Sequence, residues 1–195
     1  MLALTHPLIA AIAERLASHQ PREAAPWPEA RLAAVAAVIR VRDEPELLFI
    51  KRADVTGDPW SGHIAFPGGR MEVSDASLEA TAVRETFEEL AIDLHDGRIL
   101  GRLDDIAPRS RALPPVIVRP FVALVHPDVQ CVPSREVAAA FWVPIAFLQQ
   151  ADARVEHVVQ VQGAAARFPA YRIEEHVVWG LTERIVRQLL SLVQR

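Results

Sequence analysis

The chain has 195 residues, of which 51% are hydrophobic and 24% are charged. This balance is typical of a single globular unit and excludes a disordered chain. Lysine and arginine number 21 against 25 aspartates and glutamates, so the net charge is −4. That charge argues against a protein that binds nucleic acid duplexes by neutralising phosphates. The single cysteine, Cys131, excludes an internal disulfide and fits a reducing compartment.

Residues 1–30 are predicted to form an N-terminal helix and a linker, ahead of a main domain at residues 31–195. The helix is indicated by apolar residues at helical spacing, namely Leu8, Ile9, Ile12 and Leu16. The proline-rich stretch 20–29 predicts the linker. No secretion signal is apparent, and no uncharged run reaches the ~20 residues that span a bilayer. We therefore expect a cytoplasmic protein without membrane contact.

The rest of the chain mixes predicted strands and helices. Strands are expected at residues 32–41, 47–51, 99–103, 117–125 and 137–144, followed by an antiparallel pair at 155–161 and 165–173. Helices are expected at residues 77–90 and 181–192. The first two strands form a hairpin, and a glycine-containing loop follows at 53–63. This order predicts an α/β (α+β) fold with a mixed β-sheet.

The predicted helix at 77–90 carries the residues with the most chemical content. Glu85, Glu88 and Glu89 are spaced i, i+3 and i+4, so their carboxylates share one face. Such a face is often only a solvated acidic surface, but without a cation the three charges repel one another. Because carboxylate oxygens suit hard divalent cations, the cluster is a candidate Mg²⁺ or Mn²⁺ site. The residues expected to face the core, at i, i+4 and i+7, are Val83, Phe87 and Leu90.

A sharp turn precedes this helix. The sequence Phe-Pro-Gly-Gly at 66–69 predicts a strand end whose glycines let a backbone carbonyl approach a metal or a phosphate. A polar loop follows, and the helix then carries Arg-Glu at 84–85 and Glu-Glu at 88–89. The stretch 69–92, GRMEVSDASLEATAVRETFEELAI, strongly resembles the Nudix box. The resemblance implies a Nudix-type α/β/α sandwich that hydrolyses a diphosphate linkage.

The resemblance also implies a role for each matching residue. The ligands of the divalent ions would be the side chains of Glu85, Glu88 and Glu89 and the carbonyl of Gly68. Arg84 would pair with loop acids and orient the helix, although it could be an ordinary surface cation. The proton of the attacking water would pass to Glu85, to Glu89 or to Glu136, which precedes the strand at 137–144. Glu136 could instead be a simple surface glutamate.

The box departs from the family pattern in three places. The spacing between its first glycine and the Arg-Glu pair is one residue longer than is common, so either Glu72 or Asp75 could stand for the loop glutamate. Ala91 replaces the glycine that usually ends the helix, which concerns the cap geometry and not the ligands. Thr86 replaces an aliphatic residue.

The upstream segment resembles the additional signature of the coenzyme A diphosphatase subgroup. The matching positions are Leu47, Leu48, Arg52, Ala53, Gly62 and residues 66–69. These matches make coenzyme A or its thioesters the leading expected substrate. The second arginine of that signature is missing, however, and Gly-Asp-Pro-Trp at 57–60 lies there instead. ADP-ribose, nucleotide sugars, dinucleotides and nucleoside triphosphates are the alternatives.

The residues expected to contact a small-molecule diphosphate are Arg52, Trp60, Gly69 and Arg70, and further arginines that could bind phosphate are Arg109, Arg111 and Arg119. Each arginine could instead be a surface charge, and Trp60 could anchor its own loop. The chain is compatible with a homodimer. A nucleotide-sensing module without turnover is the rival function, which the complete acidic trio disfavours.

Overall fold

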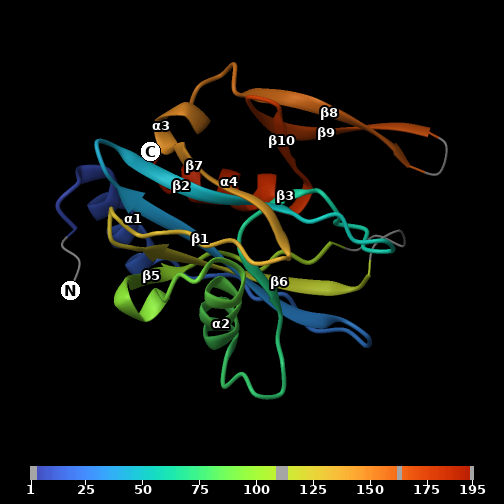
Figure 1. Cartoon of the computed structure of the whole chain (residues 1–195), viewed down its shortest axis with the longest axis horizontal. Helices are drawn as coiled ribbons and strands as arrows, with labels where there is room; N and C mark the ends of the chain where they lie inside the picture. Colours follow the sequence, from blue (N-terminus) through green and yellow to red (C-terminus); the bar gives the residue numbers. More distant parts are fainter. Residues whose placement is uncertain (1–3, 109–113, 162–163, 194–195) are drawn as a thin grey trace.

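A mixed β-sheet forms the centre of the computed structural model, which describes residues 4–108, 114–161 and 164–193 (Figure 1). Seven strands make up this sheet in the described ranges: β1 (Arg31–Val41), β2 (Pro45–Arg52), β3 (Ile64–Ala65), β4 (Gly68–Arg70), β5 (Arg98–Arg102), β6 (Val116–Leu124) and β7 (Val137–Pro144). The order β3-β2-β1-β6-β5 runs across it, while β4 pairs with β1 and β7 with β2. β1 and β6 run parallel and the other pairs antiparallel, so the predicted mixed sheet is confirmed.

Helices cover both faces of this sheet (Figure 1). The helical elements are α1 (Pro7–Ser18), α2 (Leu78–Leu90), the short 3-10 turn η1 (Leu94–Asp96), α3 (Ile145–Leu148) and α4 (Gly180–Ser191). Alternate residues of β1 face opposite layers, as the two-residue period of a strand requires. Ala36 and Val38 pack with α2, whereas Ala37 and Ile39 pack with α1 and α4. The result is an α/β/α sandwich.

A second, antiparallel sheet stands apart from the first. It consists of β8 (Arg154–Val161), β9 (Ala164–Ile173) and β10 (His176–Trp179), in the order β10-β9-β8. The hairpin of β8 and β9, which we call the arm, extends past the body of the molecule (Figure 1). The helix that follows β10 is tied to the main sheet, because the buried Thr182 hydroxyl of α4 donates a hydrogen bond of 3.0 Å to the Ile64 carbonyl of β3.

The N-terminal helix is part of the main hydrophobic core. Ile9, Ile12 and Leu16 are at most 5% exposed and belong to the same cluster as the core residues of α4. No helix in the described ranges has both the length and the apolar character needed to cross a bilayer. The segment after α1 is also fixed, because the Asp104 carboxylate accepts hydrogen bonds from the His19 ring (3.0 Å), the Arg22 backbone N–H (3.0 Å) and the Arg22 guanidinium (2.7 Å).

We expect the replacement of Asp104 by asparagine to lower the free energy of unfolding at pH 7 by about 1 kcal/mol. Burial alone would raise the pKa of Asp104, but the Arg22 backbone N–H and guanidinium outweigh it and hold this pKa below its usual 3.8. A carboxyl whose pKa falls on folding stabilises the protein above that usual value and loses this effect as the pH drops. Denaturant titrations should therefore show the deficit of Asp104→Asn shrinking below about pH 4. The exposed Asp152, changed to asparagine, is the control; an equal deficit there would contradict the assignment.

Candidate active site

Helix α2 turns an acidic face toward the sheet. The Ser77 side chain accepts a hydrogen bond from the Ala80 N–H and caps its start, while Ala91 ends it in a left-handed conformation with φ 55°. The predicted core stripe is wrong at Phe87, which is 56% exposed, whereas Glu89 is only 4% exposed. The helix is rotated so that Thr86 and Glu89 face inward, because the Glu89 carboxylate finds a hydrogen-bond donor in the strand below it.

That donor is the backbone N–H of Gly68, 2.9 Å from a Glu89 carboxylate oxygen. Gly68 pairs with Val35 of β1 and has φ +150°, and a Cβ there would collide with the Ala34 carbonyl. Only glycine can therefore bring the chain this close to β1. Burial is the main reason that the pKa of Glu89 rises to about 7, although the Gly68 hydrogen bond opposes the rise.

Glu85 lies one turn earlier and meets the next residue of the same strand. A Cβ added to Gly69 would overlap the Glu85 carboxyl group. The Glu85 carboxylate therefore occupies space that any other residue at 69 would fill. Its pKa is raised mainly by burial, and the neighbouring Arg84 guanidinium acts in the opposite direction. The Gly68-Gly69 backbone thus holds two carboxylates of α2 side by side.

Arg84 links the loop before α2 to this acidic face. Its guanidinium binds both carboxylate oxygens of Asp75, each at 2.9 Å, and donates to the carboxylates of Glu85 (3.0 Å) and Glu88 (2.9 Å). It also donates to the Arg70 carbonyl at 3.1 Å. The hydrogen bonds from the Arg84 guanidinium hold the pKa of the Asp75 carboxyl far below its usual value. Of the two acids left open by the sequence, Asp75 is therefore the one that pairs with Arg84.

The ends of β2 and β7 bring two further predicted residues to the same region. The Ser134 N–H donates to the Glu89 carbonyl (2.8 Å), and the Glu136 carbonyl accepts from the Ala53 N–H (2.9 Å). Glu136 is exposed, and its charge adds to the rise in the pKa values of Glu85 and Glu89. Arg52 pairs with Asp58 at 2.8 Å, and its buried Nε has no hydrogen-bond partner among the described residues.

The remaining predicted residues are less involved. Arg70 is exposed and contributes its carbonyl. Trp60 is half-buried in the loop, where its backbone N–H donates to the Asp58 carboxylate. Arg119 is paired with Asp105 and Glu23. The other two arginines, 109 and 111, lie outside the described residues. Asp58 is a partner that sequence reasoning missed; its only signal was an acid in the place of the absent second arginine.

Comparison with known proteins gives the class of this site. The chain belongs to the Nudix family, because the NUDIX domain matches its residues 30–162. It is 34% identical to a protein described as an uncharacterized Nudix hydrolase, NudL, of Photorhabdus laumondii, over 84% of this chain and 86% of that one. A NudL of Enterobacter sp. (strain 638), with the same description, is also 34% identical, over 82% and 81%. The chain is thus a hydrolase of nucleoside diphosphate derivatives, in a family that generally uses divalent metal ions.

Solved structures agree on the fold. A MutT/nudix family protein from Enterococcus faecalis superposes with a TM-score of 0.59 at 15% identity, covering 89% of this chain and 66% of that one. The NUDIX domain of Shewanella oneidensis NrtR, complexed with ADP ribose, gives 0.50 at 22% identity, covering 70% and 84%. The predicted Nudix-type sandwich is confirmed.

The donor set fits a hard divalent cation in its chemistry. The side chains gathered here are carboxylates, whose oxygens suit such an ion. Because Gly69 has no Cβ, the Glu85 carboxylate has room beside the backbone. In the described ranges, however, no three acidic, imidazole or thiol groups stand in a geometry that would already enclose an ion. One Arg84 nitrogen donates to the carboxylates of both Glu85 and Glu88. Glu88 is 55% exposed at its side chain, so it is free to turn away from Arg84.

Proposed function

We propose that this protein cleaves the diphosphate linkage of a nucleoside diphosphate derivative with Mg²⁺ or Mn²⁺ as cofactor. The proposed ligands are Glu85, Glu88, Glu89 and the carbonyl of Gly68. The observation that supports them is the placement of the Glu85 and Glu89 carboxylates against the Gly68-Gly69 backbone. A divalent ion bound there would neutralise the diphosphate charge and make a bound water more acidic.

The chain's own residues divide the remaining tasks. Arg84 is the proposed positioning residue, because Asp75 fixes its guanidinium and it in turn fixes Glu85. Glu136 is the proposed proton acceptor, with Glu85 and Glu89 as the alternatives. Its carboxylate is exposed and has no ion-pair partner among the described residues, so it can meet a water molecule at the edge of the site.

The proposed substrate is coenzyme A or one of its thioesters, held at its phosphates by Arg52 and Arg70 and beside Trp60 and Gly69. The resemblance of segment 47–69 to the coenzyme A diphosphatase signature supports this choice. One observation favours the alternative substrates, ADP-ribose among them. Asp58 takes up the Arg52 guanidinium where the signature has a second arginine, which adds negative charge beside the phosphate site.

A substrate screen tests both choices. Coenzyme A, its thioesters, ADP-ribose, dinucleoside polyphosphates, nucleotide sugars and nucleoside triphosphates would be incubated with Mg²⁺ or Mn²⁺, and the products identified by mass. We expect 3′,5′-ADP and 4′-phosphopantetheine from coenzyme A. Hydrolysis of only the other compounds would overturn the coenzyme A assignment. Hydrolysis of none would favour a nucleotide-sensing module.

We also propose residues 31–195 as the hydrolase domain, with residues 1–30 as its N-terminal helix and linker, acting on small molecules in the cytoplasm. A homodimer stays a prediction, which light scattering would check. The net charge of −4 supports a small-molecule partner over a nucleic acid duplex.

A further inference from the structure

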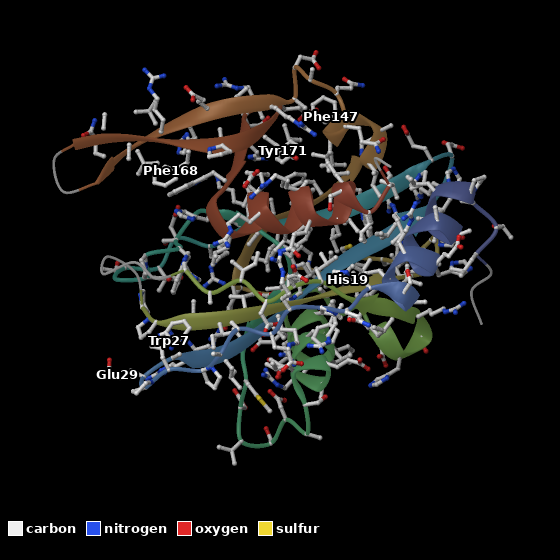
Figure 2. All side chains as sticks on the ribbon, turned by 180° about the vertical axis from the view of Figure 1, so that it is seen from behind. His19, Trp27, Glu29, Phe147, Phe168 and Tyr171 are labelled. Atoms are coloured by element: carbon white, nitrogen blue, oxygen red, sulfur yellow. The ribbon has the colours of Figure 1, made fainter. Side chains whose placement is uncertain are left out.

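Four half-buried rings gather where the arm meets the main sheet. The indole of Trp179, at the end of β10, has the ring of His63 at 5.1 Å, that of His157 at 5.2 Å and that of Phe168 at 5.5 Å between centroids. Each of the three is tilted by 47–49° to the indole. The rings come from the end of the 53–63 loop, from β8, from β9 and from β10, and Figure 2 labels Phe168 on the arm. We call these four residues the aromatic cluster.

The aromatic cluster is tied to the strand that leads into the acidic site. The Arg52 backbone N–H donates to the His63 carbonyl at 3.0 Å. The hydroxyl of Thr182, three residues after Trp179, donates to the Ile64 carbonyl. Only three residues separate Ile64 from Gly68, so the Cα atoms of these two residues lie at most about 14 Å apart. The cluster and the Gly68 N–H that binds Glu89 therefore belong to the two ends of one short segment, residues 63–68.

A cationic side chain lies close to both places. The Arg52 guanidinium interacts electrostatically with the Glu89 carboxylate and with the His63 ring, and it pairs with Asp58 at 2.8 Å. Its buried Nε has no hydrogen-bond partner among the described residues. Carboxylates, a cation and aromatic rings thus lie in one region of the molecule. A nucleotide carries a diphosphate and a base that complement these groups.

A purely structural role of the aromatic cluster, in fixing the arm, does not explain why its rings are half-exposed or why two of them are histidines. A cluster that only fixed the arm would be expected to bury its apolar rings, as Tyr171 of β9 is buried at 2% exposure. All four rings of the cluster instead stay partly accessible, and two of them are imidazoles. Half-exposed aromatic and histidine rings are the surfaces on which nucleobases stack.

We propose that the aromatic cluster is the base-binding subsite of this enzyme, where a purine of the substrate stacks on Trp179. The inference rests on the proposed function, since it takes the diphosphate to lie at α2 with Arg52 at its phosphates. The arm thereby becomes part of the substrate site, with His157 and Phe168 as specificity-determining residues.

The test measures binding of non-hydrolysable fragments, so that it does not depend on turnover. The indole N–H resonances of the full chain would be followed by NMR during titration with 5′-AMP, 5′-GMP or ribose 5-phosphate in buffer with MgCl₂. The spectrum of Trp179→Phe identifies the Trp179 signal. We expect AMP or GMP to shift this signal and ribose 5-phosphate to leave it unmoved. Trp179→Ala should weaken nucleotide binding by about 5- to 100-fold, while Trp179→Phe should change it little.

Two variants guard the interpretation. Val158→Ala alters an exposed residue on the opposite side of β8 from His157 and should leave binding unchanged. If Trp179→Ala does not fold, His157→Ala replaces it, with a smaller expected loss. Absence of a Trp179 shift with both nucleotides, or an equal loss for ribose 5-phosphate, would overturn the subsite. If the protein hydrolyses diphosphates but the Trp179 signal does not move, the proposed function stands and the subsite is wrong. If nucleotides shift the Trp179 signal but no diphosphate is hydrolysed, the subsite stands and the proposed function is wrong.

Discussion

Replacing Glu89 by glutamine should lower the rate of diphosphate hydrolysis in excess Mg²⁺ by at least about 100-fold. The change removes one negative charge from the proposed ligand set and leaves a side chain that can still accept the Gly68 N–H. The fold should therefore persist while turnover fails. Initial rates on the best compound of the screen, with circular dichroism on the same samples, measure the two effects separately.

Glu79→Gln is the matched control, because Glu79 lies on the same helix but is exposed and outside the acidic group. It should keep the wild-type rate. Changing Glu88 together with Glu89 should abolish turnover without unfolding. Full activity of Glu89→Gln would remove Glu89 from the proposed ligands.

Metal removal should expose the cost of burying the Glu89 charge. Because folding raises the pKa of Glu89 from 4.5 to about 7, its stabilising contribution is complete below pH 4.5 and is lost as the pH rises through about 7. In metal-free buffer, the Tm of the wild type should therefore fall relative to that of Glu89→Gln between pH 5 and pH 8. Added Mg²⁺ should raise the Tm of the wild type and leave that of the variant nearly unchanged. Parallel Tm curves would contradict the buried carboxylate.

Gly69→Ala is the second substitution expected to have a large effect, with a loss of about 100-fold in kcat/KM. The added methyl group would overlap the Glu85 carboxyl, which is the free end of a flexible side chain and would move aside. Displacing a ligand by about 1 Å is enough for a loss of this size. The Tm should fall little, because no backbone atom has to shift. Steady-state kinetics and a thermal melt on the same preparation measure both quantities.

Gly68→Ala provides the contrast at the neighbouring position. Its methyl group would meet the Ala34 carbonyl in β1, and its φ of +150° is unfavourable for any side chain. We expect a loss of about 2 to 4 kcal/mol in the free energy of unfolding. If Gly69→Ala were the more unstable of the two, or kept wild-type activity, the placement of Glu85 would be wrong.

Much of the fold follows from local sequence patterns. β1 and β7 are long, apolar segments, and β7 begins and ends at the predicted residues, Val137 and Pro144. β3 and β4 could not be predicted, because two or three residues show no period. β10 was not among the predicted strands, because its four residues are too few to show a period, and it is defined by its pairing with Ala170–Ile173 of β9.

The site was less accessible to sequence reasoning. Spacing alone places Glu85, Glu88 and Glu89 on one face of α2, but it does not say how that face is turned. Hydrophobicity ranks Phe87 inside and Glu89 outside, and the structure reverses this order. The reversal depends on a backbone N–H from a distant strand, which no helical period records. The Arg52–Asp58 pair was hidden for another reason, because Asp58 lies in a loop with no repeating pattern.

The layered arrangement bears on how short this protein could be made. The matched family segment, 30–162, contains the central sheet and α2 but lacks α1 and α4. Both helices cover the same side of β1, where Ala37 and Ile39 would otherwise meet water. An expression fragment trimmed to residues 30–162 would thus expose an apolar sheet face and should aggregate, although Glu85, Glu88 and Glu89 would still be in it.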